Sequence, residues 1–490
     1  MALGLIDLFW STFGLYITVI LYLFTIDVVL TIVFIQKKPP EAVLVWVIAC
    51  LAFPLAFVLL FYIFLGRDYK RKKMFGNKAE MDREVGRALF KTKGTLFESD
   101  YSKPGLGQNE SLARMLFDSG HSYLTSDNEV EYYNEGDQIF KAMLEEIKGA
   151  KRFIHMEYYM IRNDAIAKEF RQALAQKARE GVEVKLVMDA SGCHKLPRGF
   201  FKELTDAGGK TAFFFPSLIP KLNFGINNRN HRKLFVVDGD TAFIGGCNIG
   251  VEYRGEGPLG HWRDDMLRIR GSGAISVEER IVIDWNFAAK DSLKVEDYAP
   301  TRQGSGKVSL QVVSGGPDTA ARHIEEQYVK MIATAKSYIY IQTPYFVPSE
   351  AVTAALVVAA KSGVDVRVMM PSKPDHPFIY WASLFSAGHI LRSNVRIHQV
   401  NKNGFIHAKV VVMDDAVASI GSANFDNRSL GLNFESNAVV YDKGLAKKVK
   451  AAYEYDIEHW CIELTKEEYQ KRSRLVKLKE DISRLYGPIA

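Results

Sequence analysis

The feature that most constrains the fold of this chain is a polar string that occurs twice within apolar surroundings. Residues 230–250 read NHRKLFVVDGDTAFIGGCNIG, and residues 406–429 read IHAKVVVMDDAVASIGSANFDNRS. Both strings follow the pattern H-x-K-x4-D-x6-G-[GS]-x-N. On a β-strand, residues i and i+2 point to the same face, so each histidine and lysine project together. Ordinary packing explains one such pair, whereas two pairs at identical spacing predict a shared site.

The two strings belong to an internal duplication that covers most of the chain. Each copy begins with a helical pattern, continues through a strand, a second helical pattern and a second strand, and then reaches its string. In the first copy these segments cover residues 135–150, 151–161, 165–181 and 182–192, and in the second copy they cover residues 316–335, 336–347, 349–363 and 364–374. This alternation predicts an α/β fold around a mixed or mostly parallel sheet, with the copies related by a pseudo-twofold axis.

Shifts in composition divide the chain into five predicted segments, with PTRQGSGK at residues 300–307 as the linker between the copies. We expect a transmembrane helical hairpin over residues 1–66, a basic juxtamembrane and lead-in segment over 67–128, a first α/β domain over 129–299, a second over 308–465 and an amphipathic tail over 466–490. The tail carries a helical apolar stripe, formed by Leu475, Leu478, Ile482 and Leu485. Packing on the protein's own body is the favoured explanation of the stripe, and contact with a lipid surface is the alternative.

The hairpin is predicted from two apolar runs, over about residues 8–35 and 43–65. About 20 helical residues cross a hydrocarbon core, so both runs are long enough to span a membrane. A cleaved signal peptide fits poorly, because MALGLID carries no positive charge and no A-x-A site follows. The link between the runs carries Lys37 and Lys38, while GRDYKRKK after the second run carries five basic residues. By the positive-inside rule, we expect a multi-pass protein whose termini and large C-terminal part face the cytoplasm.

Charge and cysteine usage narrow the function classes. The net charge is +6, and the run RDYKRKK next to the predicted membrane segment accounts for most of it. Anionic lipid therefore explains the surplus better than nucleic acid, and we expect no nucleic-acid partner. The four cysteines are far apart and form no CxxC pair, which argues against a zinc site or a disulfide framework. We expect neither a metal nor another cofactor.

The duplicated strings bring together side chains suited to a phosphodiester. The pseudo-twofold would gather two imidazoles, two ammonium groups and two amides around one point, from His231, Lys233, Asn248, His407, Lys409 and Asn424. Lysines and amides would hold the non-bridging oxygens, where positioning and electrostatics do most of the work. An unperturbed imidazole has a pKa of about 6.5. One histidine can therefore attack phosphorus in its neutral form while the other, protonated, supplies a proton to the leaving oxygen.

These strings resemble the paired HKD motifs of the phospholipase D superfamily. The whole chain resembles the bacterial cardiolipin synthases of that superfamily, through the N-terminal hairpin and through HMEYYMIRND, IQTPYFVPSE, PDHPFIYWAS and GSANFDNRSLGLNFE. The likeness covers nearly all 490 residues. It implies two phospholipase D-like domains, a bacterial inner-membrane location and a phosphatidyltransferase that forms a covalent phosphatidyl-histidine. The implied reaction joins two phosphatidylglycerol molecules into cardiolipin and releases glycerol, without a cofactor.

The resemblance implies that an acidic residue downstream orients each histidine. The matching acids are Asp264, in HWRDD after His231, and Glu435, 28 residues after His407. The usual use of the first motif in the superfamily favours His231 as the nucleophile.

The resemblance extends to supporting residues. Asp238 and Asp414 complete the catalytic signature at the strand ends, although in this superfamily they look structural. Ser422 is expected to support phosphate binding, whereas Gly246 takes the equivalent place in the first copy and is expected to be tolerated. Three further residues are candidates for substrate contact: Glu157 at a strand end, Tyr345 in TPYF and His376 in PDHP.

Several alternatives stay open at this stage. A phospholipase D-type hydrolase, or a transphosphatidylase that uses another alcohol such as phosphatidylethanolamine, would carry the same motifs. The hairpin and the nearly neutral remainder of the chain disfavour a nuclease, and two intact motifs disfavour a catalytically inactive membrane scaffold. The expected partners are phosphatidylglycerol and cardiolipin in the membrane, and the sequence leaves open whether the chain forms a homo-oligomer.

Overall fold

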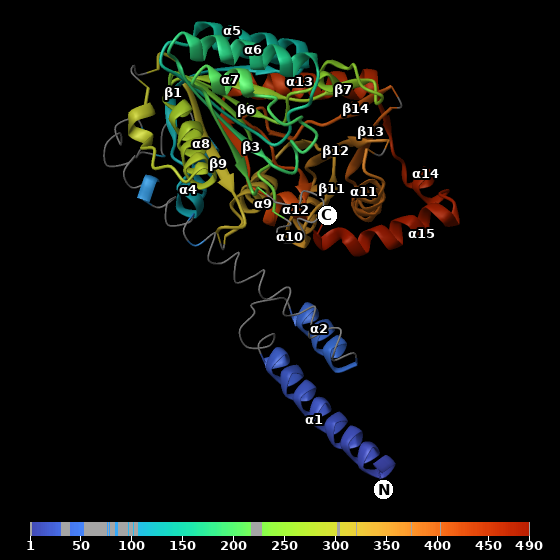
Figure 1. The fold of residues 1–490 in the computed structure, drawn as a ribbon. Helices are drawn as coiled ribbons and strands as arrows, with labels where there is room; N and C mark the ends of the chain where they lie inside the picture. Colours follow the sequence, from blue (N-terminus) through green and yellow to red (C-terminus); the bar gives the residue numbers. More distant parts are fainter. Residues whose placement is uncertain are drawn as a thin grey trace. The chain divides into compact units, whose positions relative to one another are not determined.

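The computed structural model describes residues 2–30, 40–52, 106–216, 228–300, 304–319, 321–373, 375–401 and 403–489, and residues 76, 78, 84–86, 97 and 101 of the lead-in segment. The chain divides into two compact units, residues 1–77 and 78–490. The first unit contains two apolar helices, and the second contains both copies of the duplicated string (Figure 1).

The helices of the first unit are α1 (Ala2–Leu30) and α2 (Pro40–Ala52). Among the described residues, α1 is the one helix long and apolar enough to cross a membrane, with a mean hydropathy of 2.2 over Phe13–Leu30. Val28 and Cys50 are buried where the two helices pack together. Residues 31–35 and 53–65, which would complete the predicted spans, lie outside the described residues. One apolar helix of membrane-spanning length is therefore present, and the hairpin stays a prediction.

The second unit is organised around a sheet of 15 strands whose order repeats in its two halves. From one edge, the first half contains β4 (Lys210–Phe214), β3 (Glu183–Asp189), β2 (Phe153–Tyr158), β5 (Lys233–Val237), β6 (Thr241–Gly245), β8 (Met266–Arg270) and β1 (Thr125–Tyr133). From the other edge, after β19 (Cys461–Glu463), the second half contains β13 (Arg396–Val400), β12 (Asp365–Pro371), β10 (Tyr338–Gln342), β15 (Val410–Met413), β16 (Val417–Gly421), β18 (Glu435–Tyr441) and β9 (Val308–Gly315).

In each half, three neighbouring strands of the sheet run parallel to one another, and the remaining pairs are antiparallel. β2 pairs in parallel with β3 and β3 with β4, and the same holds for β10, β12 and β13. The halves join where β1 pairs antiparallel with β9. The predicted α/β fold with a mixed sheet and an internal duplication is confirmed. The copies share one sheet, and the first begins at Thr125, four residues before the predicted boundary at 129.

Helices cover the outer faces of the sheet, and the inner faces of its two halves pack on each other. On the first half the outer helices are α5 (Gly136–Gly149) and α6 (Ala165–Arg179), and on the second half they are α4 (Glu110–Gly120), α9 (His323–Thr334) and α10 (Glu350–Lys361). The inner core contains α8 (Gly273–Ala289) and α13 (Lys443–Trp460), and within it β6 contacts β16 and β18. Both faces of the motif strands β5 and β15 are buried, which explains why these strands read as continuous apolar runs.

Candidate active site

The site is built where the backbone of each half crosses to the other. In the first crossing, β7 (His261–Arg263) of the first half pairs in parallel with β14 (Gly404–Ile406) of the second. The amide of His407 donates to the Arg263 carbonyl at 2.8 Å. His407 follows β14 and Asp264 follows β7, so this short pairing places the two side chains next to each other.

An equivalent crossing forms at the other motif. An isolated parallel bridge joins Asn230 to Phe434, and the amide of His231 donates to the Phe434 carbonyl at 2.9 Å. His231 follows Asn230 in the chain, and Glu435 follows Phe434. The pseudo-twofold therefore places a histidine of one half beside an acid of the other half in both crossings.

Each histidine is oriented by the acid of the opposite half. Nδ1 of His231 lies 3.0 Å from the Glu435 carboxylate, and Nδ1 of His407 lies 2.6 Å from the Asp264 carboxylate. The sequence order implied that each acid orients the histidine that precedes it in the chain. That pairing is wrong. Sequence order does not reveal the observed pairing because the two crossings are contacts between segments about 150 to 200 residues apart.

Glu435 is fully buried and receives several hydrogen bonds. Besides the His231 imidazole, its carboxylate accepts from Ser422 Oγ at 2.5 Å, Ser429 Oγ at 2.9 Å and Asn433 Nδ2 at 3.2 Å. Burial alone would raise the pKa of Glu435, but the neighbouring imidazole, a lysine and these donors outweigh it and hold the pKa below its usual value. This acid is therefore ionised near pH 7, and Ser422 acts as its support.

Asp264 has a different environment. Its carboxylate accepts from the Asp265 amide at 2.8 Å, and burial raises the pKa of Asp264 to about 6 although Lys409 opposes the shift. Gly246 takes the place that Ser422 has in the second half. A Cβ at Gly246 would collide with the Asp264 carboxylate, so the glycine is required by the position of this acid. The missing serine therefore leaves Asp264 with fewer donors than Glu435.

The two motif lysines lie beside the histidines of their own strands. Lys233 Nζ donates to the His231 carbonyl at 2.5 Å, and Lys409 Nζ lies 3.0 Å from Nδ1 of His407. Both lysines are buried, and burial lowers the pKa of Lys233 to about 7 and that of Lys409 to about 8, with nearby carboxylates opposing. A phosphodiester bound beside them would favour their protonated forms, because an opposite charge stabilises an ammonium.

Both histidines are neutral near pH 7. Burial lowers the pKa of His231 to about 4, with Glu435 opposing and Lys233 adding to the shift. Burial and the adjacent Lys409 hold the pKa of His407 well below its usual value. A neutral His231 that donates from Nδ1 to ionised Glu435 has its Nε2 lone pair available. This is the state that a nucleophilic imidazole requires.

The chain is similar to known proteins over most of its length. A sequence profile described as "Cardiolipin synthase, PLD-like domain" matches residues 143–253 and 328–457. Cardiolipin synthase 2 of Staphylococcus epidermidis is 39% identical over 465 residues, which cover 94% of this chain and 94% of that protein. A cardiolipin synthase of Staphylococcus aureus is 38% identical over 464 residues, which cover 94% of this chain and 93% of that protein. This chain belongs to the cardiolipin synthase family.

A solved structure supports the fold. A phosphatidylserine synthase of Haemophilus influenzae matches with a TM-score of 0.60 and 13% identity, over 77% of this chain and all of that chain. At this identity the likeness concerns the fold alone. Together with the two profile matches, it supports the expectation of two phospholipase D-like halves.

The aspartates of the cardiolipin synthase signature lie away from the histidines. The carboxylate of Asp238 accepts from the amides of residues 151–153 at 2.7–3.0 Å, and that of Asp414 accepts from the amides of residues 336–338 at 2.8–3.0 Å. At strand geometry, the seven residues from histidine to aspartate span roughly 20 Å. The prediction that these aspartates are catalytic is therefore wrong. Each of them connects the end of its motif strand to the start of the neighbouring strand.

The signature asparagines contact their own halves. Asn248 Oδ1 accepts from the Met160 amide at 3.2 Å, and its Nδ2 donates to Tyr253 Oη at 2.6 Å. Asn424 Nδ2 donates to Asp426 at 3.1 Å. Both side chains brace loops that carry site residues, and their contact with a substrate phosphate stays a prediction.

Two of the predicted substrate contacts lie near the site, in the second half. Tyr345 Oη donates to the Asp375 carboxylate, and the ring of His376 lies 6.3 Å from that of Tyr345. Asp375 also lies close enough to His407 to oppose the lowering of its pKa. The His376 side chain is 68% exposed. Substrate contact by Tyr345 and His376 stays a prediction.

Glu157 lies elsewhere. It is 1% exposed, and burial together with the neighbouring Asp284 carboxylate raises the pKa of Glu157 well above its usual value. Asp284 in turn pairs with Arg232 and, at 3.0 Å, with Lys78. The prediction that Glu157 contacts substrate is wrong, because its side chain joins this buried polar cluster under α8.

Several site residues were missed from the sequence. Ser429 and Asn433 support Glu435, Tyr159 packs against the His231 ring at 4.8 Å, and Asp375 binds Tyr345. Ser429 and Asn433 lie in the quoted segment GSANFDNRSLGLNFE, but nothing in their spacing indicates that they point at the acid. Asp375 directly precedes His376, so its position in PDHP was the one available signal.

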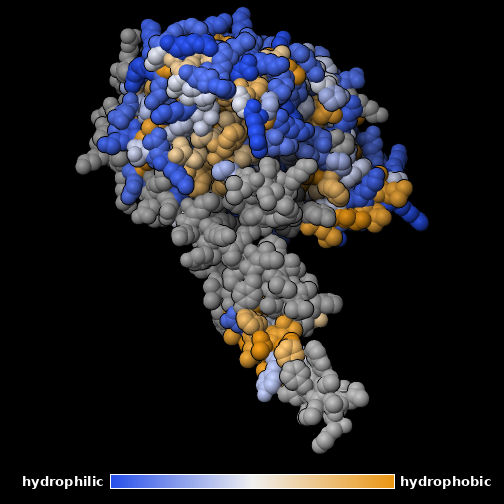
Figure 2. Space-filling view, in the orientation of Figure 1, coloured by the Kyte–Doolittle hydropathy of each residue, from blue (hydrophilic) through white to orange (hydrophobic). Residues whose placement is uncertain are grey.

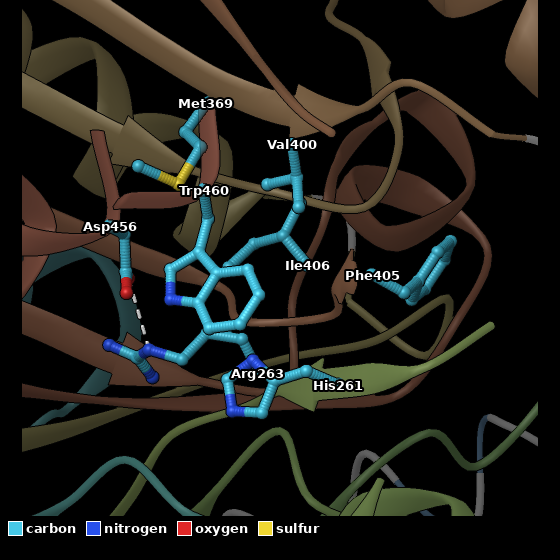
Figure 3. Close-up of a pocket in the computed structure, with 8 residues that line it drawn as sticks. All are labelled: His261, Arg263, Met369, Val400, Phe405, Ile406, Asp456 and Trp460. Carbon is cyan, nitrogen blue, oxygen red and sulfur yellow. Dashed lines mark hydrogen bonds and ion pairs between the residues drawn. The ribbon is translucent and has the colours of Figure 1, made fainter. Parts of the chain in front are cut away.

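A small pocket lies beside the first crossing (Figure 3). It is partly open to solvent, and its lining residues are His261, Arg263, Met369, Val400, Phe405, Ile406, Asp456 and Trp460. Arg263 Nε donates to Asp456 at 3.0 Å, and the His261 ring stacks on Trp460 at 4.8 Å. These contacts hold β7 against the second half, and they position the histidine–acid pair that follows.

Proposed function

We propose that this protein is a membrane-bound cardiolipin synthase that joins two phosphatidylglycerol molecules and releases glycerol. The observation that carries the proposal is the pair of crossed histidine–acid contacts beside Lys233 and Lys409. This arrangement offers one imidazole for attack, a second for proton transfer and two cations for a phosphate. The names of the Staphylococcus relatives support cardiolipin synthesis.

In the first displacement, Nε2 of His231 attacks the phosphorus of one phosphatidylglycerol. The bond from phosphorus to the head-group oxygen breaks, the leaving oxygen takes a proton from His407, and glycerol departs. The charge that develops on His231 is balanced by the ionised Glu435 at its Nδ1. The bound phosphate opposes the influence of Lys409 on His407, which allows His407 to hold the proton that it delivers.

In the second displacement, neutral His407 takes a proton from a head-group hydroxyl of the second phosphatidylglycerol. That oxygen attacks phosphorus, the bond to His231 breaks, and cardiolipin is released. Asp264, whose pKa is about 6, stabilises His407 in both charge states. One phosphodiester is exchanged for another in each round, so the chemistry needs no external energy source.

The membrane keeps the substrate concentrated and limits competition by water for the intermediate. We place the protein in the bacterial inner membrane as a multi-pass protein with its catalytic unit on the cytoplasmic side, on the basis of the apolar runs and the basic residues that follow them. Its partners are then phosphatidylglycerol and cardiolipin, and its basic surplus serves anionic lipid rather than nucleic acid.

The test uses the full-length protein in lipid nanodiscs with phosphatidylglycerol labelled in the head group. One glycerol should be released for each cardiolipin formed, and added glycerol should drive the reaction backward because it competes for the same intermediate. His231→Ala and His407→Ala should each reduce turnover by several orders of magnitude, because residues that act as one unit are not additive. Phosphatidic acid as the sole lipid product would instead make the protein a phospholipase.

A further inference from the structure

The apolar stripe in the C-terminal tail faces outward. The tail contains α14 (Lys466–Gln470), α15 (Arg474–Ser483) and the turn η8 (Arg484–Ile489). The exposed fractions of the stripe are 70% for Leu475, 55% for Leu478, 46% for Ile482 and 74% for Leu485. Figure 2 shows apolar side chains gathered along α15 at the edge of the catalytic unit. The interpretation that this stripe packs on the protein's own body is therefore wrong.

The opposite side of α15 packs on α11 (Pro377–Ile390). Its buried residues are Glu480 and Ser483. Glu480 accepts from Arg472 Nε at 2.6 Å and from Tyr469 Oη at 3.1 Å, and Lys479 Nζ lies 5.1 Å from the centre of the Trp381 ring. A surface helix normally buries its apolar side. This helix buries its polar side instead, so its apolar side is available to something outside the unit.

The tail lies next to segments that carry site residues. α11 begins two residues after Asp375, and Asn427, the first residue of α12 (Asn427–Gly431), donates to the Gly487 carbonyl at 3.1 Å. A surface that contacted the tail would therefore lie close to the loops around His407.

We propose that this tail surface, formed by Leu475, Leu478, Ile482 and Leu485, docks on an anionic lipid bilayer beside the active site. Residues 471–485 contain six basic and two acidic residues. At helical spacing, Arg474 falls at one border of the stripe, where its charge reaches lipid phosphates while its stem covers apolar surface. An apolar stripe within a basic segment matches the interface of an anionic bilayer.

The same charges disfavour a second copy of the chain as the occupant. Two identical tail surfaces in a symmetric dimer would face each other. Each tail would then bring six basic residues and two acidic residues against the same set of its copy, and this surplus of positive charge is unfavourable. The proposal rests on the proposed function because a lipid substrate is what makes docking near the site useful.

The direct test places an environment-sensitive dye on the full-length protein in nanodiscs. The dye is attached to Leu478→Cys in a Cys461→Ser background, since Cys461 is the one cysteine of the chain that is not buried. Val358→Cys, on α10 and 63% exposed in the native protein, is the matched control. The Leu478→Cys dye should shift to an apolar emission in nanodiscs of phosphatidylcholine with phosphatidylserine, and less in phosphatidylcholine alone. The control dye should show an aqueous emission in both.

An activity measurement separates docking from catalysis. The variant Leu478→Glu/Ile482→Glu should lose about tenfold in cardiolipin synthesis from long-chain phosphatidylglycerol in vesicles. Its activity on dispersed short-chain phosphatidylglycerol, which needs no bilayer contact, should stay near that of the native protein. Val358→Glu should match the native protein on both substrates.

Three results would overturn the proposal. These are an aqueous emission of the Leu478→Cys dye in both kinds of nanodisc, equal losses of the double variant on the two substrates, and dissociation of a native dimer by the double variant. If the native protein made no cardiolipin from either substrate while the dye still shifted, the proposed function would fail and the docking surface would stand.

Discussion

Glu435 accepts hydrogen bonds from two serines and an asparagine, whereas its counterpart Asp264 accepts one from a backbone amide. The pKa of Glu435 is consequently held below its usual value, and the pKa of Asp264 is raised to about 6. The two histidines occupy equivalent places but differ in how firmly their acids hold a negative charge. A permanent carboxylate suits a histidine that becomes a cation during attack, and an acid near its titration point suits a histidine that exchanges protons.

This asymmetry predicts opposite responses to neutralising each acid. With a phosphatidyl ester of p-nitrophenol, whose leaving group needs no proton, Asp264→Asn should keep the first burst of nitrophenol within about tenfold of the native rate. Glu435→Gln should slow that burst by about 100-fold or more, because the nucleophile loses its counter-charge. Glu463→Gln, at an exposed glutamate, is the control. Stopped-flow absorbance measures the burst, and the reverse order of effects would contradict the assigned roles.

The lysines predict the alkaline limb of the pH profile. Burial lowers the pKa of Lys233 to about 7 and that of Lys409 to about 8, so each ammonium is present below its pKa and is lost as pH rises through it. The value of kcat/KM should therefore fall as pH rises above about 7, since it reports groups of the free enzyme. In Lys233→Arg the midpoint of the alkaline limb should move toward about pH 8. Arginine stays charged, so the loss of activity then follows the deprotonation of Lys409. An unmoved limb would rule Lys233 out as its source.

At the scale of elements, the long motif strands and the short crossing strands differ in how far the sequence predicts them. The motif strands β5 and β15 are predictable from sequence, because their apolar runs and their repeated spacing are local signals. The two crossings are not predictable from sequence, because β7 and β14 have three residues each and the second crossing is a single bridge. The motif histidines and lysines and the two acids could therefore be named in advance, while the exchange of acids between the halves could not.

The same limit explains two errors about side chains. Glu157 lies at the end of a predicted strand, yet alternation along β2 turns it toward α8, and sequence periodicity does not distinguish the two faces of a strand buried on both. The apolar stripe of α15 has the spacing of a buried helix face, and only its contacts with α11 reveal that it faces outward. The local sequence pattern predicted both elements, but it did not determine which of their faces points toward the rest of the protein.

The signature aspartates belong to this scale. Asp414→Ala removes the acceptor of three backbone amides and should lower the free energy of unfolding by about 1–3 kcal/mol. Its kcat, measured well below the new Tm, should stay within a few-fold of the native value. Asp206→Ala, at an exposed surface pair, controls for loss of a carboxylate. Thermal unfolding and turnover are measured on the same sample. A large loss of kcat with an unchanged Tm would return Asp414 to the catalytic set.

At the scale of the whole molecule, the duplication makes the active site a property of both halves. Each motif histidine is paired with an acid of the other half, so neither half can orient its own motif histidine alone. The pseudo-twofold axis that the repeat predicts therefore also brings each histidine next to the acid that orients it. The N-terminal unit adds an apolar helix of membrane-spanning length, which fits an enzyme whose substrates are lipids.

The charge pattern around the apolar runs predicts the topology. A reporter fused after Ala490 should behave as cytoplasmic, because five basic residues follow the second run while two lysines lie between the runs. A reporter inserted after Pro39, between the runs, should behave as periplasmic if both runs cross. Paired reporters that are active in one compartment and inactive in the other provide the measurement. Periplasmic activity of the Ala490 fusion would overturn the orientation.

The central claim is that phosphatidyl transfer passes through His231, held by an acid of the other half. Its most direct test is to mix the full-length protein with phosphatidylglycerol in nanodiscs, denature it during turnover and map the lipid adduct by peptide mass spectrometry. The adduct should lie on the peptide that contains His231, and Glu435→Gln should reduce its amount. An adduct on His407, or steady turnover with no adduct on either histidine, would contradict the account.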